Sequence, residues 1–182
     1  MNTYRILANS ELVRYADFLK QRDASSLHVY FGYAISHDSI DVLVADMCQR
    51  PTDNHIVAAL DQDLAIIGTV HIAQMSAQQV EFGVMVAENH RKQGHADRMM
   101  DYAITWCRNR GISDLYMHCL STNAPIRHLV RKNGLTITQQ GPETDAQLRL
   151  PPTDFFAWGH ELALIQQNAM AETIMSFTRA LR

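Results

Sequence analysis

The chain has 182 residues, of which 47% are hydrophobic and 19% charged; this balance is typical of one globular domain and excludes a disordered or fibrous chain. Its formal net charge of -3 provides no overall attraction to nucleic acid, which requires clustered Lys and Arg. Because the N-terminus lacks a signal-peptide pattern and no stretch has the roughly 18 apolar residues of a membrane span, we expect a cytoplasmic protein with no nucleic-acid or membrane partner.

Two helices are expected at the start of the chain, before the sheet begins. Ser10 is placed to cap a helix that reaches about Gln21, and residues 39–49 have the pattern of a second, short helix. Three apolar stretches then predict an antiparallel meander, with strands at residues 55–60, 65–73 and 79–86.

A crossover unit is predicted next. Residues 94–110 place their apolar side chains on one face of a helix that ends at Gly111, and residues 114–120 form a strand. Because a strand, a helix and a strand follow one another, strands 79–86 and 114–120 should be parallel neighbours. The central sheet is therefore expected to be mixed and mostly antiparallel.

The last third of the chain is predicted to contain a helix, a hairpin and a long final helix. The first of these spans residues 123–132, and the hairpin strands are 135–140 and 146–150, around a turn at 141–145. Asp154 is placed to cap a last helix that reaches about Leu181. That helix has apolar residues on more than one face, which suits packing on the core together with a homodimer contact.

No metal site is predicted. Cys48, Cys107 and Cys119 include no CxxC pair, and we interpret them as small buried side chains. His160 and Glu161 resemble the start of an HExxH zinc helix, but Leu stands at the position of the second His. We therefore interpret that pair as surface residues of the last helix.

The turn RKQGHA at residues 91–96 has features of an anion site. A helix start presents unpaired N–H groups and about half a positive charge, so it attracts a phosphate wherever the backbone can be approached. Gly94 allows that approach, and Arg91 and Lys92 add positive charge. The turn is not a Walker A loop, because His95 follows the glycine, and a single glycine does not make GxGxxG. Taken alone, such a pattern more often belongs to a solvent-exposed loop that only joins a strand to a helix.

Two motifs of the chain resemble those of the GNAT superfamily of N-acetyltransferases. RKQGHA matches the acyl-CoA pyrophosphate signature of that family at Arg91, Gly94 and Ala96. In the second motif, an Asn begins a helix, and a Gly followed by an apolar residue ends it. The matching positions in this chain are Asn123, Leu129, Lys132, Gly134 and Leu135. The resemblance implies the α/β acyl-CoA N-acyltransferase fold, with helices on both faces of the mixed sheet and an extra C-terminal helix.

The resemblance also implies how the chain is divided. The order of elements agrees with the family from roughly residue 50 to 150, and two N-terminal helices are also expected. Residues 1–150 would be the acetyltransferase domain, and residues 151–182 a C-terminal helical extension packed on the same domain.

The resemblance implies a site for acetyl-CoA. The pantetheine arm would enter a gap between strand 79–86 and its parallel neighbour, and would bond backbone groups at Val84, Met85 and Val86. The pyrophosphate would lie on the N–H groups of Arg91, Lys92, Gln93, Gly94, His95 and Ala96. Asn123 would contact the pantetheine arm near the thioester; it is equally suited to cap its helix, and both roles can hold together.

Acetyl transfer to the primary amine of a small molecule or a protein is the implied reaction. An alkyl amine has a pKa near 10.4 and is mostly protonated at neutral pH, so a nearby base helps. Glu81 is the candidate, with a solvated edge glutamate as the alternative. Family members often carry a Tyr seven residues after the Asn, aimed at the sulfur; here that position is Val130. His118, His128 or water are left as proton donors.

A second function is consistent with the same motifs. Because Val130 cannot donate a proton, the chain could instead be a non-catalytic acyl-CoA-binding regulatory or interaction module. In either case the last helix would serve as a dimer contact or as a cover for the acceptor site, and we prefer the homodimer.

Overall fold

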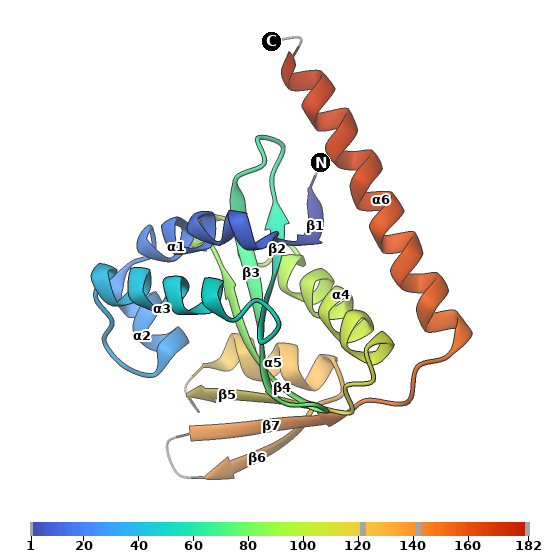
Figure 1. The fold of residues 1–182 in the computed structure, drawn as a ribbon. Helices are drawn as coiled ribbons and strands as arrows, with labels where there is room; N and C mark the ends of the chain where they lie inside the picture. The colour runs from blue at the N-terminus through green and yellow to red at the C-terminus, as the bar shows by residue number, and fades with distance from the viewer. Residues whose placement is uncertain (1, 121–122, 141–142, 181–182) are drawn as a thin grey trace.

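A seven-stranded sheet runs through the molecule, with helices on both of its faces (Figure 1). The computed structural model describes residues 2–120, 123–140 and 143–180. Within them the strands are β1 (Thr3–Ile6), β2 (Asn54–Leu60), β3 (Ile66–Ser76), β4 (Gln79–Val86), β5 (Asp114–Leu120), β6 (Thr136–Gln140) and β7 (Glu143–Arg149). The helices are α1 (Leu12–Lys20), α2 (Ala24–Phe31), α3 (His37–Gln49), α4 (His95–Asn109), α5 (Ala124–Lys132) and α6 (Phe155–Ala180), with 3-10 turns η1 (Asn9–Glu11) and η2 (Glu88–His90).

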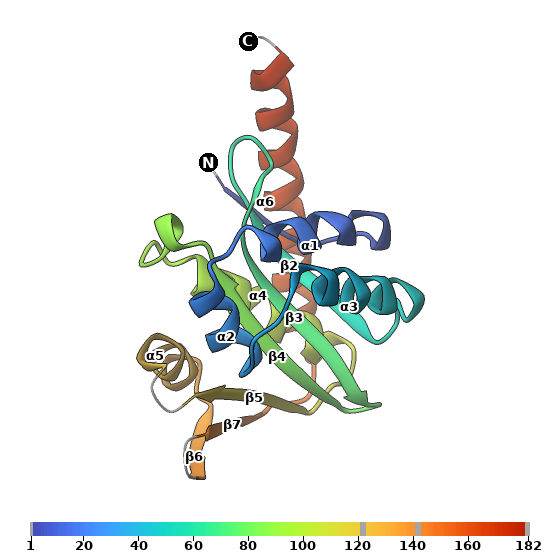
Figure 2. The ribbon, with the colours of Figure 1, turned by 90° about the vertical axis from the view of Figure 1, so that its left-hand side faces the viewer.

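The sheet is mixed, as predicted. Its strand order is β1-β2-β3-β4-β5-β7-β6, and among the described strands β4 and β5 are the parallel pair. These two strands pair at three positions, Gln79–Asp114, Val80–Leu115 and Glu81–Tyr116. Beyond Glu81, β4 keeps its pairing with β3 while β5 diverges from it, and Figure 2 shows this divergence.

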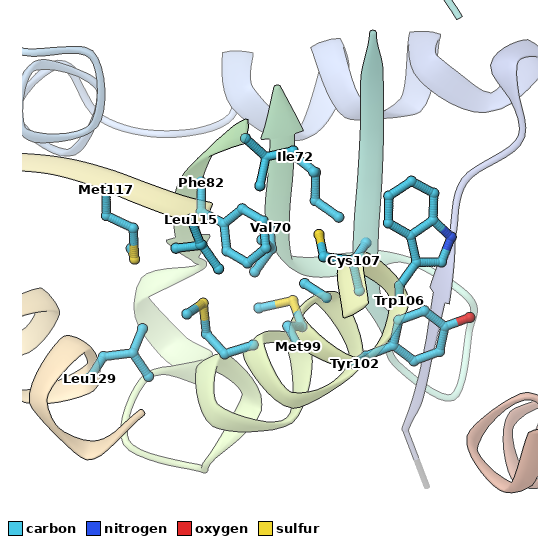
Figure 3. Close-up of a cluster of buried hydrophobic side chains, with 14 of the residues drawn as sticks. Val70, Ile72, Phe82, Met99, Tyr102, Trp106, Cys107, Leu115, Met117 and Leu129 are labelled. Atoms are coloured by element: carbon cyan, nitrogen blue, oxygen red, sulfur yellow. The ribbon is translucent and has the colours of Figure 1, made fainter. Parts of the chain in front are cut away.

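Each face of the sheet carries its own hydrophobic cluster. One lies between the sheet and α4, where Phe82, Met99 and Leu115 are almost completely buried (Figure 3). The other lies between the sheet and helices α1 and α3, and it includes Leu19 and Ile40. Burial of one such side chain contributes about 1.5–3 kcal/mol. The two clusters therefore hold the sheet firmly between its helical layers.

The N-terminal region departs from the prediction in two ways. The sheet begins before the helices, because Thr3–Ile6 pairs antiparallel with β2 as strand β1; four residues are too few to reveal a period in the sequence. An additional helix, α2, lies between α1 and α3. Asp23 caps it by accepting a hydrogen bond from the N–H of Ser26 at 2.7 Å, and Gly32 ends it with a φ of 79°.

The start of α1 also differs from the prediction. Ser10 lies within η1, and the N-cap residue of α1 is Glu11, so Ser10 does not cap this helix. Hydrogen bonds from the Arg5 guanidinium, at 2.6 and 2.8 Å, and the nearby charge of Arg14 hold the pKa of Glu11 at about 2. This ion pair joins β1 to the first helix.

The last strand begins earlier than predicted. β7 starts at Glu143, so residues 143–145 belong to a strand instead of a turn, and residues 141–142 of the predicted turn lie outside the described residues. Asp154 caps α6 as predicted, because its carboxylate accepts a hydrogen bond from the N–H of Ala157 at 2.7 Å.

Helix α6 packs on α4, and a buried carboxylate anchors it there. Glu161 is 6% exposed and accepts hydrogen bonds from Arg110 at 2.8 Å and from Asn109 at 2.6 Å. The prediction of a surface position for Glu161 is therefore wrong, because its two partners at the C-terminal end of α4 allow a charged group to be buried. The neighbouring His160 is exposed, as predicted.

Further along, α6 follows the edge strand β1 (Figure 1). The side-chain oxygen of Asn168 accepts a hydrogen bond from the backbone N–H of Tyr4 at 2.8 Å, and Glu172 pairs with Arg5 at 2.7 Å. A backbone group at the edge of the sheet thus receives a partner from the end of the chain. None of the described helices, α6 included, combines the length and the apolar character needed to cross a membrane.

Candidate functional site

A cleft opens where β4 and β5 separate. It has a volume of about 560 Å³ and is lined by residues from the end of β4, the turn at residues 90–97, helix α5 and helix α2. A concave site of this size, with apolar walls and a few polar groups, is typical of small-molecule binding. Among the described residues, no group of His, Cys, Asp and Glu side chains is placed to hold a metal ion.

The structure brings together most of the residues predicted to bind a cofactor. Nine of the ten line the cleft, namely Val84, Met85, Val86, Arg91, Lys92, Gly94, His95, Ala96 and Asn123. Gln93 is not among the lining residues, and its side-chain amide donates to the carbonyl of Asn89 at 3.1 Å. Glu81 does not line the cleft either; it lies half-buried at the last parallel pair, where the two strands begin to diverge.

The turn before α4 has the backbone geometry of an anion site. Gly94, the N-cap residue of α4, has a φ of 80°, and Lys92 has a φ of 61°. The first N–H groups of a helix have no partner within the helix, so those that follow Gly94 are available to an anion. A Cβ added at Gly94 would meet no atom within 4 Å, so the space in front of this helix start is open. α4 has 15 residues, and its dipole adds positive charge at the same place.

Arg91 connects this turn to helix α2. Its Nε donates to the carbonyl of Val86 at 3.2 Å, and its Nη2 donates to the hydroxyl of Ser26 at 3.1 Å. The Arg91 side chain therefore uses the backbone carbonyl of Val86 at the end of β4 as a hydrogen-bond acceptor. It also holds the first turn of α2 beside the cleft. This contact was not expected from the sequence, where Arg91 is assigned to phosphate binding alone.

His95 supplies a buried polar atom at the cleft. Its Nδ1 lies 2.8 Å from the hydroxyl of Tyr4, and its Nε2 is buried without a hydrogen-bond partner among the described residues. Burial lowers the pKa of His95, and the proximity of His90 and Arg98 lowers it further. A buried nitrogen without a partner is unfavourable by itself. A ligand with an acceptor or a donor at this point would satisfy it.

Asn123 and Val130 show how α5 contributes. The side-chain oxygen of Asn123 accepts a hydrogen bond from the N–H of Ile126 at 3.3 Å, so the residue caps α5 while it also lines the cleft. Val130 is fully buried in the cluster under α4 and offers no proton donor. His128 lines the cleft, whereas His118 lies on β5 and binds Asp145 at 2.6 Å.

Tyr30 is a cleft residue that sequence reasoning missed. It comes from α2, a helix that contacts both β4 and β5, and its ring lies directly on Gly83. A Cβ at Gly83 would lie 2.7 Å from the Tyr30 hydroxyl oxygen, so any larger residue there would force the Tyr30 ring to move. Two features of the sequence could have indicated this contact. Gly83 lies in the middle of a strand, where a glycine suggests the close approach of another group, and Asp23 and Gly32 mark the two ends of helix α2.

The Tyr30 hydroxyl belongs to a small polar group on the same face of the sheet. It lies 3.1 Å from the Tyr15 hydroxyl. Burial raises the pKa of Tyr30 to about 12, and the negative charge of Glu81 acts in the same direction. His71, opposite Gly83 on β3, is neutral, because burial lowers its pKa to about 4.

Comparisons with known proteins agree with this geometry. Residues 11–135 match the model of a family described as "Acetyltransferase (GNAT) family". No curated protein sequence matches the chain.

Solved structures share the fold at low identity. The GNAT domain of S. lividans PAT is 19% identical, with a TM-score of 0.67 over 81% of this chain and 89% of that one. Spermidine N-acetyltransferase from Vibrio cholerae, in complex with CoA and spermine, is 17% identical, with a TM-score of 0.65 over 82% and 95%. The yncA protein of Salmonella typhimurium, with its cofactor acetyl-CoA, is 16% identical, with a TM-score of 0.63 over 85% and 96%.

Proposed function

Since the chain belongs to the GNAT family of acetyltransferases, we propose that it is an acetyl-CoA-dependent enzyme that acetylates a primary amine of a small molecule or a protein. The observation that carries this proposal is the cleft at the divergence of β4 and β5, with the helix start at Gly94 on its wall. The solved structures from Vibrio cholerae and Salmonella typhimurium, which contain CoA and acetyl-CoA, support the choice of cosubstrate.

The residues present fit acetyl-CoA. The N–H groups at Gly94 and His95 would hold the pyrophosphate in the open space before α4, and the Nε2 of His95, which has no partner among the described residues, would offer one further contact. Backbone groups of Val84 and Val86, which β5 leaves free to face the cleft, would hold the pantetheine arm. The hydrogen bond from Arg91 Nε to the carbonyl of Val86 would have to break before that carbonyl could bind the pantetheine arm. The thioester supplies an activated acetyl group.

Glu81 is proposed as the base. It lies at the inner end of the divergence and shares a strand face with Gly83, so its carboxylate is on the side where α2 covers the sheet. From there it can accept a proton from the incoming amine, which is mostly protonated at neutral pH.

The function can be tested with purified protein, acetyl-CoA and a panel of polyamines, amino acids, aminoglycosides and lysine peptides, while released thiol is followed. Binding of CoA without acetylation of any amine would favour the alternative, a non-catalytic acyl-CoA-binding regulatory or interaction module. The burial of Val130, at the position where the family often has a tyrosine, favours that alternative.

Replacing Glu81 by glutamine is expected to lower kcat about 100-fold at neutral pH and to leave the affinity for CoA unchanged, because only the proton acceptor is lost. The difference in kcat between wild type and Glu81→Gln should become smaller as the pH rises toward the pKa of the amine, since more of the substrate is then already deprotonated. Glu88→Gln, at an exposed position of η2, is the matched control. Equal rates for Glu81→Gln and Glu88→Gln across this pH range would exclude Glu81 as the base.

The exposed side of α6 supports a homodimer. Phe155, Phe156, Trp158, Leu162, Ile165, Met170, Ile174 and Phe177 are between 46% and 87% exposed. Together they present on the order of 1,000 Å² of apolar side chain, which is the area that one partner contributes to a stable interface. The carboxylates among its described side chains, Glu161 and Glu172, both bind the body of the molecule. An uncharged helix face can meet a copy of itself without repulsion.

We propose that residues 151–182 form this dimer contact as an extension of the domain at residues 1–150. Replacing both Leu162 and Ile165 by glutamate should convert a dimer into a monomer with unchanged CoA affinity, because each interface would then contain four carboxylates. Sedimentation velocity measures the change, with Val42→Glu on α3, 70% exposed, as the control. A wild-type protein that sediments as a monomer at all concentrations would contradict the proposal.

A further inference from the structure

Helix α2 follows the cleft along its length. At one end, Ser26 binds Arg91 of the turn before α4, and at the other end Tyr30 lies on Gly83 of β4. Val84 and Val86 line the cleft between these two points. Because α2 contacts both β4 and β5, Tyr30 sits over the divergence of the two strands.

The Tyr30 hydroxyl thus marks the inner end of the cleft. The parallel pairing of β4 and β5 stops at Glu81, and Gly83 is the second residue beyond it. A pantetheine arm that starts from the turn at Gly94 and runs along Val86 and Val84 would bring its sulfur toward this end. The absence of a side chain on Gly83 allows the phenol ring to approach the strand.

The surroundings keep this hydroxyl protonated. Burial raises the pKa of Tyr30 to about 12, and the nearby negative charge of Glu81 disfavours the phenolate. The Tyr15 hydroxyl, 3.1 Å away, holds it in place. His71, which faces the same region from β3, is neutral at pH 7 and does not compete as an acid.

We propose that the Tyr30 hydroxyl donates a proton to the sulfur of coenzyme A, in the role that the buried Val130 cannot fill. This inference rests on the proposed function. The amine reacts in its neutral form, after its ammonium proton has passed through Glu81 to solvent. Its nitrogen then forms a bond to the acetyl carbon and gives one further proton to the carboxylate of Glu81. The C–S bond breaks, and Tyr30 gives its proton to the departing sulfur. The proton on Glu81 then returns to the Tyr30 phenolate, which restores both residues.

Tyr30→Phe removes the hydroxyl and keeps the ring on Gly83. We expect kcat to fall about 100-fold, with the Kd for CoA close to the wild-type value. The midpoint of thermal unfolding should fall modestly, because the buried Tyr15 hydroxyl loses its partner. Tyr33→Phe, at a 57% exposed position just beyond α2, is the matched control and should keep full activity. If an amine is acetylated and Tyr30→Phe retains a kcat within about threefold of wild type, the inference is overturned.

A second measurement does not depend on turnover. The thiol of bound CoA can be titrated by its ultraviolet thiolate absorbance. A hydrogen bond from Tyr30 stabilises the thiolate, so the pKa of the bound thiol should lie about one unit lower in the wild type than in Tyr30→Phe. Equal thiol pKa values in the two proteins would overturn the inference. If no amine is acetylated, the proposed function fails, and this titration still decides whether Tyr30 contacts the sulfur.

Discussion

Replacing Gly94 by valine is expected to weaken the binding of coenzyme A about 100-fold. The φ of 80° at Gly94 lies in the left-handed region, which a β-branched residue disfavours strongly. In addition, a side chain there would fill the open space in front of α4, where nothing else lies within 4 Å of the Cβ position. The ligand would lose charge-assisted hydrogen bonds to the helix start, each of which contributes about 1.5–3 kcal/mol.

The control for this variant is provided by the other end of α4. Gly111 has a φ of 75°, and its Cβ position is equally open. Gly111→Val therefore imposes a similar backbone strain far from the cleft, and it should reduce stability while leaving CoA binding intact. Titration calorimetry with CoA and thermal unfolding of both variants separate the two effects. Wild-type affinity in folded Gly94→Val would refute the anion site at this turn.

The second large effect is expected from the ion pair under α6. Replacing Arg110 by methionine should lower the free energy of unfolding by about 3 kcal/mol, because it leaves the carboxylate of Glu161, 6% exposed, without its counter-charge. Methionine retains part of the packing of Arg110 on the ring of Trp106, which lies 4.1 Å from the guanidinium carbon. Urea unfolding measures the difference.

A double variant separates charge from packing at this position. Arg110→Met combined with Glu161→Leu removes both charges together, and apolar pairs of similar volume often replace buried ion pairs without loss. The double variant should therefore recover most of the lost free energy of unfolding. The part that it does not recover is the contribution of the hydrogen bond between Glu161 and Asn109, at 2.6 Å. A double variant as unstable as Arg110→Met alone would mean that packing, and not charge, holds α6 on α4.

The centre of the fold and the wall of the cleft could be predicted from the sequence because their signals are local. Apolar alternation gives residues 79–86 and 114–120 as strands, and both ranges agree with β4 and β5. The helix start at Gly94 likewise has a glycine and basic neighbours within six residues. The order of strand, helix and strand then implies the parallel pairing that creates the cleft.

Other parts could not be predicted because their stabilising partners lie far away in the sequence. The burial of Glu161 depends on Arg110 and Asn109, about 50 residues earlier, and no pattern within α6 encodes it. Tyr30 is recognisable as a cleft residue only once α2 is placed over Gly83. Strand β1, with four residues, owes its place to pairing with β2 and to contacts with α6.

The bond between Asn168 and Tyr4 spans 164 residues of the chain. At a translation rate of roughly 5–20 residues per second, its two partners leave the ribosome about 8–30 seconds apart. During this interval the first strand is an uncovered edge that other nascent chains can pair with. A chaperone that shields the N-terminal strand would therefore protect newly made protein, and stalled chains that lack the final helix would be the species most prone to aggregate.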